Sequence, residues 1–424
     1  MKRRVLFGLA LLFGVVVLFG ALLRRTPANA FAQPTEKAEA SPRRLVGNAS
    51  CAASVCHGGT SIGQPLSEAA TWQSLDPHAR AYDTLLKPVS KTIAERLWKG
   101  SMQAHDAPLC LRCHVHPAYD QARPNFRKAD GVGCESCHGA AQDWLTPHYR
   151  PEWKKSDHRA LGFADTKTLN SRVELCARCH VGTPVASVDH DLIAAGHPAL
   201  RFEFATYFAN LPPHWDVQKD KRANSTAGVK ELDFELRAWV VGQTISAACA
   251  LDLLAHRADP ANKKPWSEFS EHDCFACHHE LQPASWRQKK QPDRRLGSIA
   301  WSQWYFVGVS RDFIQATPQH ALSDPPLFSD FRPQARDRIE LSKKASLDAT
   351  KLRQAAKSKF LVGSIGLDSP ANWEEAAQYY LSLLSQQQYR KDNQYPANAD
   401  EEKRVEQLRK QVTLESGFAP QSQK

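Results

Sequence analysis

The feature that most constrains this 424-residue chain is a short cysteine pattern that occurs four times. Two cysteines separated by two residues are followed at once by a histidine, at Cys110-Cys113-His114, Cys134-Cys137-His138, Cys176-Cys179-His180 and Cys274-Cys277-His278. This CxxCH unit is the attachment signature of a c-type haem, in which the two thiols bind the porphyrin and the histidine becomes an axial ligand of the iron. The chain is therefore expected to fold around several large, flat cofactors.

A fifth and looser unit has four residues, instead of two, between Cys51 and Cys56, and His57 follows. We interpret it as another haem site, and the alternative is a local disulfide between Cys51 and Cys56. Cys249 remains, in an apolar run, and is expected to be a buried thiol. Paired CxxC units also occur in zinc sites, but a histidine directly after each of the four pairs favours haem.

The second axial ligands are expected to be histidines. The chain has only two methionines, the initiating Met1 and Met102, so at most one haem can have His/Met ligation. Bis-histidine ligation should then dominate, with low reduction potentials. On local grounds the better candidates are His78, which follows Asp76-Pro77 at a helix start, and His148 and His197, which lie in turns containing proline.

Helical patterns dominate the sequence, and strand signals are scarce. The expected fold class is mainly α, with short helices and loops wrapped around the covalent haems over residues 47–281. Longer helices are predicted at 90–99 and at 231–257, the second of which Pro260 closes. Beyond residue 281, charged helical patterns at 336–360, 372–388 and 400–412 predict a helical C-terminal domain over 282–424 with a disordered end.

The first 46 residues predict export followed by a linker. Residues 1–30 fit either a signal peptide cleaved after Ala30 or an uncleaved membrane anchor, and residues 31–46 form a polar linker. Both alternatives place the remaining chain in the periplasm or another extracytoplasmic compartment, either soluble or associated with the inner membrane. The net charge of +10 does not predict a nucleic-acid partner, because basic and acidic residues are interspersed and haem propionates add negative charge.

The order of these features resembles the multihaem cytochromes c of the cytochrome c-554 family. The resemblance covers about residues 47–180. It includes the first site, Trp72 with the segment 78–81, the site at Cys110, the stretch 131–139, a histidine ten residues after His138, and the site at Cys176. The looser first site departs from the family pattern. The fifth site and the C-terminal part lie outside the resemblance.

The resemblance also implies a set of axial ligands. It implies that His78 is the distal ligand of the haem on His138, and that His148 is the distal ligand of the haem on His57. The haem on His114 would be five-coordinate. The haem on His180 would take a downstream histidine, for which His190, His197 and His214 compete. The fifth haem inherits no partner, although His256 and His272 lie near it in sequence.

Two functions are weighed on this basis. The first is an electron carrier, not an enzyme, in which about five haem c groups pass electrons between redox partner proteins. The second is an oxidoreductase that acts on a small nitrogen oxide or a hydroxylamine-like substrate at the open haem on His114. The large number of histidines favours the carrier, because they suffice to complete the coordination of every iron. No catalytic residue is assigned.

Overall fold

The computed structural model of the chain describes residues 43–224, 233–278, 299, 301–302, 304–306 and 337–356, together with 403 and 406. The predicted signal or anchor lies outside the described residues, as do the predicted helix at 372–388 and most of the one at 400–412. The described residues all belong to one compact unit. Its described part is mainly helical and contains only isolated β-bridges, which confirms the expected fold class.

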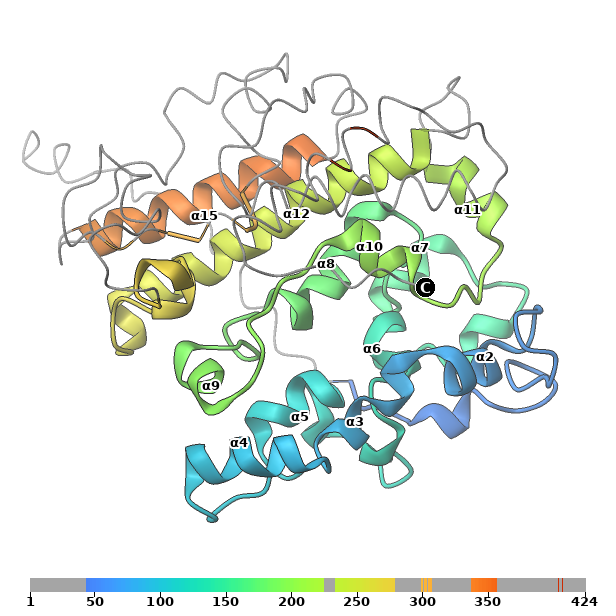
Figure 1. Ribbon diagram of the computed structural model, residues 1–424. Helices are drawn as coiled ribbons and strands as arrows, with labels where there is room; N and C mark the ends of the chain where they lie inside the picture. The colour runs from blue at the N-terminus through green and yellow to red at the C-terminus, as the bar shows by residue number, and fades with distance from the viewer. Residues whose placement is uncertain are drawn as a thin grey trace, which may run out of the picture. The chain divides into compact units, whose positions relative to one another are not determined.

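Short helices joined by loops occupy residues 68–224 (Figure 1). They are α2 (Glu68–Leu75), α3 (Ala81–Thr84), α4 (Pro88–Trp98), α5 (Pro108–His114), α6 (Cys134–His138), α7 (Lys155–Ala160), α8 (Leu169–His180), α9 (His190–Ala195), α10 (Phe204–Ala209) and α11 (Val217–Asn224). Single 3-10 turns lie between them, including η2 (Pro77–Arg80), and η7 (Phe269–Glu271) and η8 (Cys274–Ala276) follow later in the chain. The helix predicted at 90–99 is confirmed as α4, which starts at Pro88 because proline suits the first turn of a helix.

Two long helices, α12 (Asp233–Ala258) and α15 (Asp337–Ala356), pack side by side (Figure 1). The helix predicted at 231–257 is thus confirmed, and α15 falls within the one predicted at 336–360. The stretch Arg237–Ala258 is long and apolar enough to cross a membrane, but 94% of its most apolar window is buried by the rest of the protein. Helix α12 is therefore the central core helix of the described part of the chain.

The main hydrophobic core forms around α12, where α8, α10 and α15 pack against it. Phe202 and Phe204 enter this core beside α12. Gly242 permits the close approach of α10, because a Cβ atom at this position would lie 2.8 Å from the Cβ of Phe204. Burying these large apolar side chains stabilises the fold.

Ion pairs link α15 to α8 and α12. The guanidinium of Arg353 lies 2.6 Å from a carboxylate oxygen of Glu174 and 2.6 Å from one of Asp252. The thiol of Cys249 lies beside these ion pairs and is buried, as the sequence predicted. Burial raises the pKa of the Cys249 thiol to about 12, so the group stays protonated and unreactive at neutral pH.

The part of the chain before α8 has a different kind of interior. Its apolar residues form two small clusters, with five and three buried members, and a third small cluster joins Ile93 of α4 to Leu192 and Ala195 of α9. Glu135, within α6, holds the segment 45–47 against this region, because its buried carboxylate accepts hydrogen bonds from the backbone N–H groups of Val46, Gly47 and Ala141. Such small clusters leave room for cofactors to supply the missing apolar contacts.

Candidate haem sites

Four of the attachment histidines end short helical elements. His114, His138 and His180 are the last residues of α5, α6 and α8, and His278 follows η8. The helix starts are set by local chemistry: Pro108 occupies the first turn of α5, and the side chain of Thr168 caps α8 by accepting a hydrogen bond from Ser171 N. Each CxxCH unit is thus presented on one helical turn, so that its two thiols and its histidine lie close together.

Four of the five attachment histidines face a second histidine ring. The distance between ring centroids is 6.3 Å for His57 and His148, 6.0 Å for His180 and His78, 6.3 Å for His138 and His214, and 6.4 Å for His278 and His190. Two imidazoles that bind opposite sides of one metal ion at about 2 Å each have centroids about 6 Å apart. The spacing of all four pairs therefore fits bis-histidine ligation of a haem iron.

Hydrogen bonds at Nδ1 orient several of these rings. Nδ1 of His57 lies 2.9 Å from a carboxylate oxygen of Glu68, and Nδ1 of His78 lies 2.8 Å from one of Asp76. The Nδ1 atoms of His148, His114 and His197 lie beside the backbone carbonyls of Leu145, Ala81 and Pro198, respectively. A ring that donates its Nδ1 proton in this way presents an unprotonated Nε2, the arrangement that metal-bound histidines use.

Burial keeps several of these rings neutral. Burial lowers the pKa values of His138 and His180 to about 4, and it also lowers the pKa of His114. His78 differs, because its hydrogen bond with Asp76 raises its pKa. A neutral imidazole is the form that binds a metal ion, so the buried rings are ready to act as ligands.

The structure agrees with one of the two implied pairings and differs from the other. It brings His148 to His57, as the resemblance implies. However, His78 faces His180 and not His138, and the ring opposite His138 is that of His214. Asp76 fixes the ring of His78, and the backbone carbonyl of His78 accepts a hydrogen bond from Val132 N, so this segment lies between α6 and the end of α8.

The fifth site finds its partner in α9. His190, the first residue of α9, stacks against His278 with an angle of 27° between the ring planes. The histidines nearer to this site in sequence have other contacts: His272 stacks on Trp301, and His256 lies against Asn262. From the sequence, His190 is expected only as one of three competitors for the haem on His180.

The attachment cysteines also approach one another across different sites. The Cys134 thiol donates a hydrogen bond to Cys51, which lowers the pKa of Cys51, and the Cys179 thiol acts in the same way on Cys113. Cys137 interacts electrostatically with Cys179. All eleven cysteines are free thiols in the structure, so the alternative disulfide between Cys51 and Cys56 is not formed.

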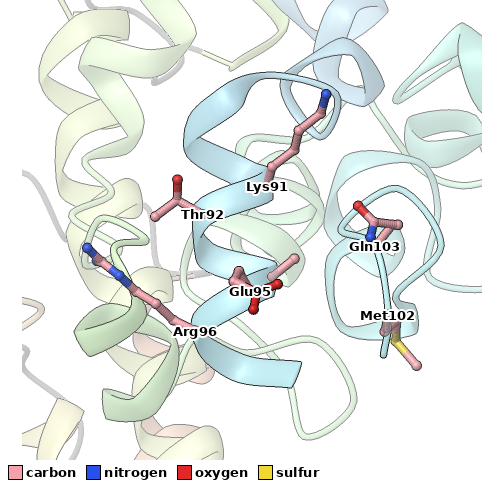
Figure 2. A pocket seen from close by; sticks show the side chains of 7 residues that line it. Lys91, Thr92, Glu95, Arg96, Met102 and Gln103 are labelled. Carbon is pink, nitrogen blue, oxygen red and sulfur yellow. The ribbon is translucent and has the colours of Figure 1, made fainter. Parts of the chain in front are cut away.

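An open hollow of about 490 Å³ lies beside α4. Figure 2 shows Lys91 and Glu95 on the side of α4 toward Met102 and Gln103, and Thr92 and Arg96 on the side away from them. Ala94, which also lines the hollow, belongs to the small cluster that packs against Cys110. The hollow therefore lies next to the cluster that contacts the second attachment site, and Met102 is one of its lining residues.

Comparison with known protein families supports the haem assignment. Residues 50–139 match the family model of cytochrome c554 and c-prime. The matched segment contains the first three attachment sites, which confirms the resemblance to the cytochrome c-554 family there, whereas the sites at Cys176 and Cys274 lie outside it. No curated protein and no solved structure matches the chain. The match indicates a protein that binds haem c covalently and transfers electrons.

Proposed function

We propose that this chain is an electron-transfer protein that carries five c-type haems and passes electrons between redox partner proteins. The observation that carries the proposal is the set of four facing histidine pairs, each of which joins an attachment histidine to one from another part of the chain. A bound haem supplies an iron that accepts and gives up one electron. The chain supplies two strong ligands, which saturate that iron and favour electron transfer over substrate binding.

The first site supports a count of five despite its CxxxxCH spacing. The rings of His57 and His148 lie as far apart as those of the pairs at standard sites. Glu68 holds the Nδ1 atom of His57, as Asp76 holds that of His78. Because the spacing of the two rings is the same, we assign a haem to Cys51 and Cys56 as well.

The contacts between cysteines give an order for the electron path. Each thiol binds the edge of its own porphyrin, so two cysteines in contact bring two haem edges together. The hydrogen bond of Cys134 to Cys51 joins the first site to the third, and that of Cys179 to Cys113 joins the fourth to the second. The electrostatic interaction of Cys137 with Cys179 places the third site near the fourth. The first four haems would then transfer electrons in the order first, third, fourth, second.

Redox partners need access to the ends of the path. At the first site, Cys56 is exposed, and Val55, Ile62 and Leu66 offer apolar surface around it. At the fifth site, Cys274, Cys277 and His278 are exposed. We propose that partner proteins dock at these two sites. We place the chain outside the cytoplasmic membrane, where family members work, and its N-terminal segment would be cleaved or would anchor it to the inner membrane.

The intact mass of the purified protein tests the haem count. We expect a mass that corresponds to five haems, and a loss of one haem when Cys51 and Cys56 are both replaced by alanine. Cys249→Ser is the matched control and should keep all five, because its thiol lies in the core beside α15. A four-haem mass for the unchanged protein would overturn the assignment of the first site.

A second experiment separates the carrier from the oxidoreductase alternative. The reduced protein should be reoxidised by a redox protein of higher reduction potential, such as another c-type cytochrome, but not by nitrite or hydroxylamine. Rapid reoxidation by either small molecule would instead support an enzyme with an open haem on His114.

A further inference from the structure

Helix α9 carries one histidine at its start and one just after its end. His190 is the first residue of the helix, and His197 follows Gly196, which ends it in the left-handed conformation at φ 119°. The side chain of Asp189 caps the other end by accepting a hydrogen bond from Leu192 N at 2.9 Å. At 1.5 Å per helical residue, the two histidines lie about 10 Å apart along the helix axis.

The first end of α9 is fixed at the fifth haem site. The backbone N–H of His190 donates to the carboxylate of Glu268 at 2.9 Å. Arg257, in α12, donates to the carbonyl of Val188 at 3.0 Å and forms an ion pair of 2.6 Å with Glu271. These contacts hold the ring of His190 against that of His278.

The second end of α9 is fixed at the second haem site. Arg96, in α4, donates to the carbonyl of Ala195 at 3.1 Å, and Ile93 packs against Leu192 and Ala195. Ala94 of α4 shares a small cluster with Leu111 of α5, so the last turn of α9 lies near the second site. The segment that leads into α9 is held there as well, because Arg112, between Cys110 and Cys113, donates to the carbonyl of Val185 at 2.6 Å. His197 follows the second end, and its Nδ1 lies 2.8 Å from the Pro198 carbonyl.

We propose that α9 supplies an axial ligand at each of its ends, His190 to the fifth haem and His197 to the haem on His114. The inference rests on the proposed function and completes its ligand set. It closes the coordination position that the family resemblance leaves open. It also extends the electron path from the second haem to the fifth through one rigid element.

The competing ligand for the haem on His114 is Met102. Met102 lines the hollow beside α4, in the loop that follows this helix, and 38% of its surface is exposed (Figure 2). His197 instead follows a helix end that Arg96 and Ile93 of α4 hold in place. The histidine is therefore the better-positioned group.

Electron paramagnetic resonance of the oxidised five-haem protein tests the proposal. The unchanged protein should show only low-spin ferric haem. His197→Ala should convert about one fifth of the haem to a high-spin form that binds cyanide, and added imidazole should restore the low-spin form. His190→Ala should do the same at a different haem, so the double variant should convert about two fifths. Met102→Leu is the matched control and should change nothing.

The outcomes separate this inference from the function on which it rests. A high-spin haem in the unchanged five-haem protein that His197→Ala leaves unaltered would overturn the closed site but not the carrier. Conversion by Met102→Leu would assign the position to the methionine and also overturn the inference. A protein with fewer than five haems would contradict the proposed haem array itself. If His197→Ala does not fold, His197→Met answers the question, because a His/Met haem has a distinct near-infrared magnetic circular dichroism band.

Discussion

Asp76 offers a direct test of which haem His78 serves. Its carboxylate accepts hydrogen bonds from the backbone N–H of His78 at 2.9 Å and from Nδ1 of the same residue at 2.8 Å. The carboxylate makes the imidazole a stronger electron donor, which favours ferric iron over ferrous iron. Asp76→Asn should therefore raise the reduction potential of the haem to which His78 is bound, the one on His180.

The size of the shift follows from the kind of hydrogen bond that is lost. A hydrogen bond to a charged group contributes about 1 kcal/mol more than a neutral one. For a one-electron couple this corresponds to a rise of about 40 mV. The side chain of Asp76 is only 9% exposed, so solvent screens the effect weakly.

Spectroelectrochemical titration measures this shift, and Glu68→Gln provides the matched control. Glu68 holds the Nδ1 atom of His57 in the same way, but its side chain is 26% exposed, so we expect a smaller rise at the haem on His57. His78→Ala identifies the signal of the affected haem, because it removes the ligand. If Asp76→Asn shifted the haem on His138 instead, or shifted none, the pairing of His78 with His180 would be refuted.

Two further predictions concern stability and reactivity. Glu135→Ala leaves three buried N–H groups without an acceptor and should lower the free energy of unfolding by about 3–6 kcal/mol in urea titrations. Glu135→Gln keeps one acceptor and should lower it less. Equal stability of Glu135→Ala and the unchanged protein would contradict this prediction. Because burial raises the pKa of Cys249 to about 12, iodoacetamide at neutral pH should label this thiol only after unfolding, and rapid labelling of the folded protein would show that the thiol is accessible.

The haem attachment sites could be predicted from sequence because each is local. Two thiols and a histidine within five residues define one site, whatever surrounds it. The long helices could be predicted as well, since α4 and α12 follow the apolar spacing of the sequence. Neither prediction needed to know which distant segments meet.

The distal ligands could be predicted only in part, because they depend on tertiary contacts. The family resemblance implies that His148 pairs with His57, and the structure brings these two rings together; it implies that His78 pairs with His138, whereas the structure places His78 beside His180. The position of His78 depends on Asp76, Val132 and the end of α8, which are up to about 100 residues apart. His214 could not be placed opposite His138, since nothing in its neighbouring sequence points to α6.

The contrast between the two interiors of the chain has a consequence for its biosynthesis. Helices α8, α10, α12 and α15 share one large hydrophobic core, whereas the region before α8 has only small clusters of buried residues. Exported before its cofactors are attached, the chain would fold first around α12, and its earlier segments would stay accessible to the attachment machinery. Proteases applied to the haem-free protein should accordingly spare α12 and digest residues 43–163, so that maturation proceeds against an already folded half.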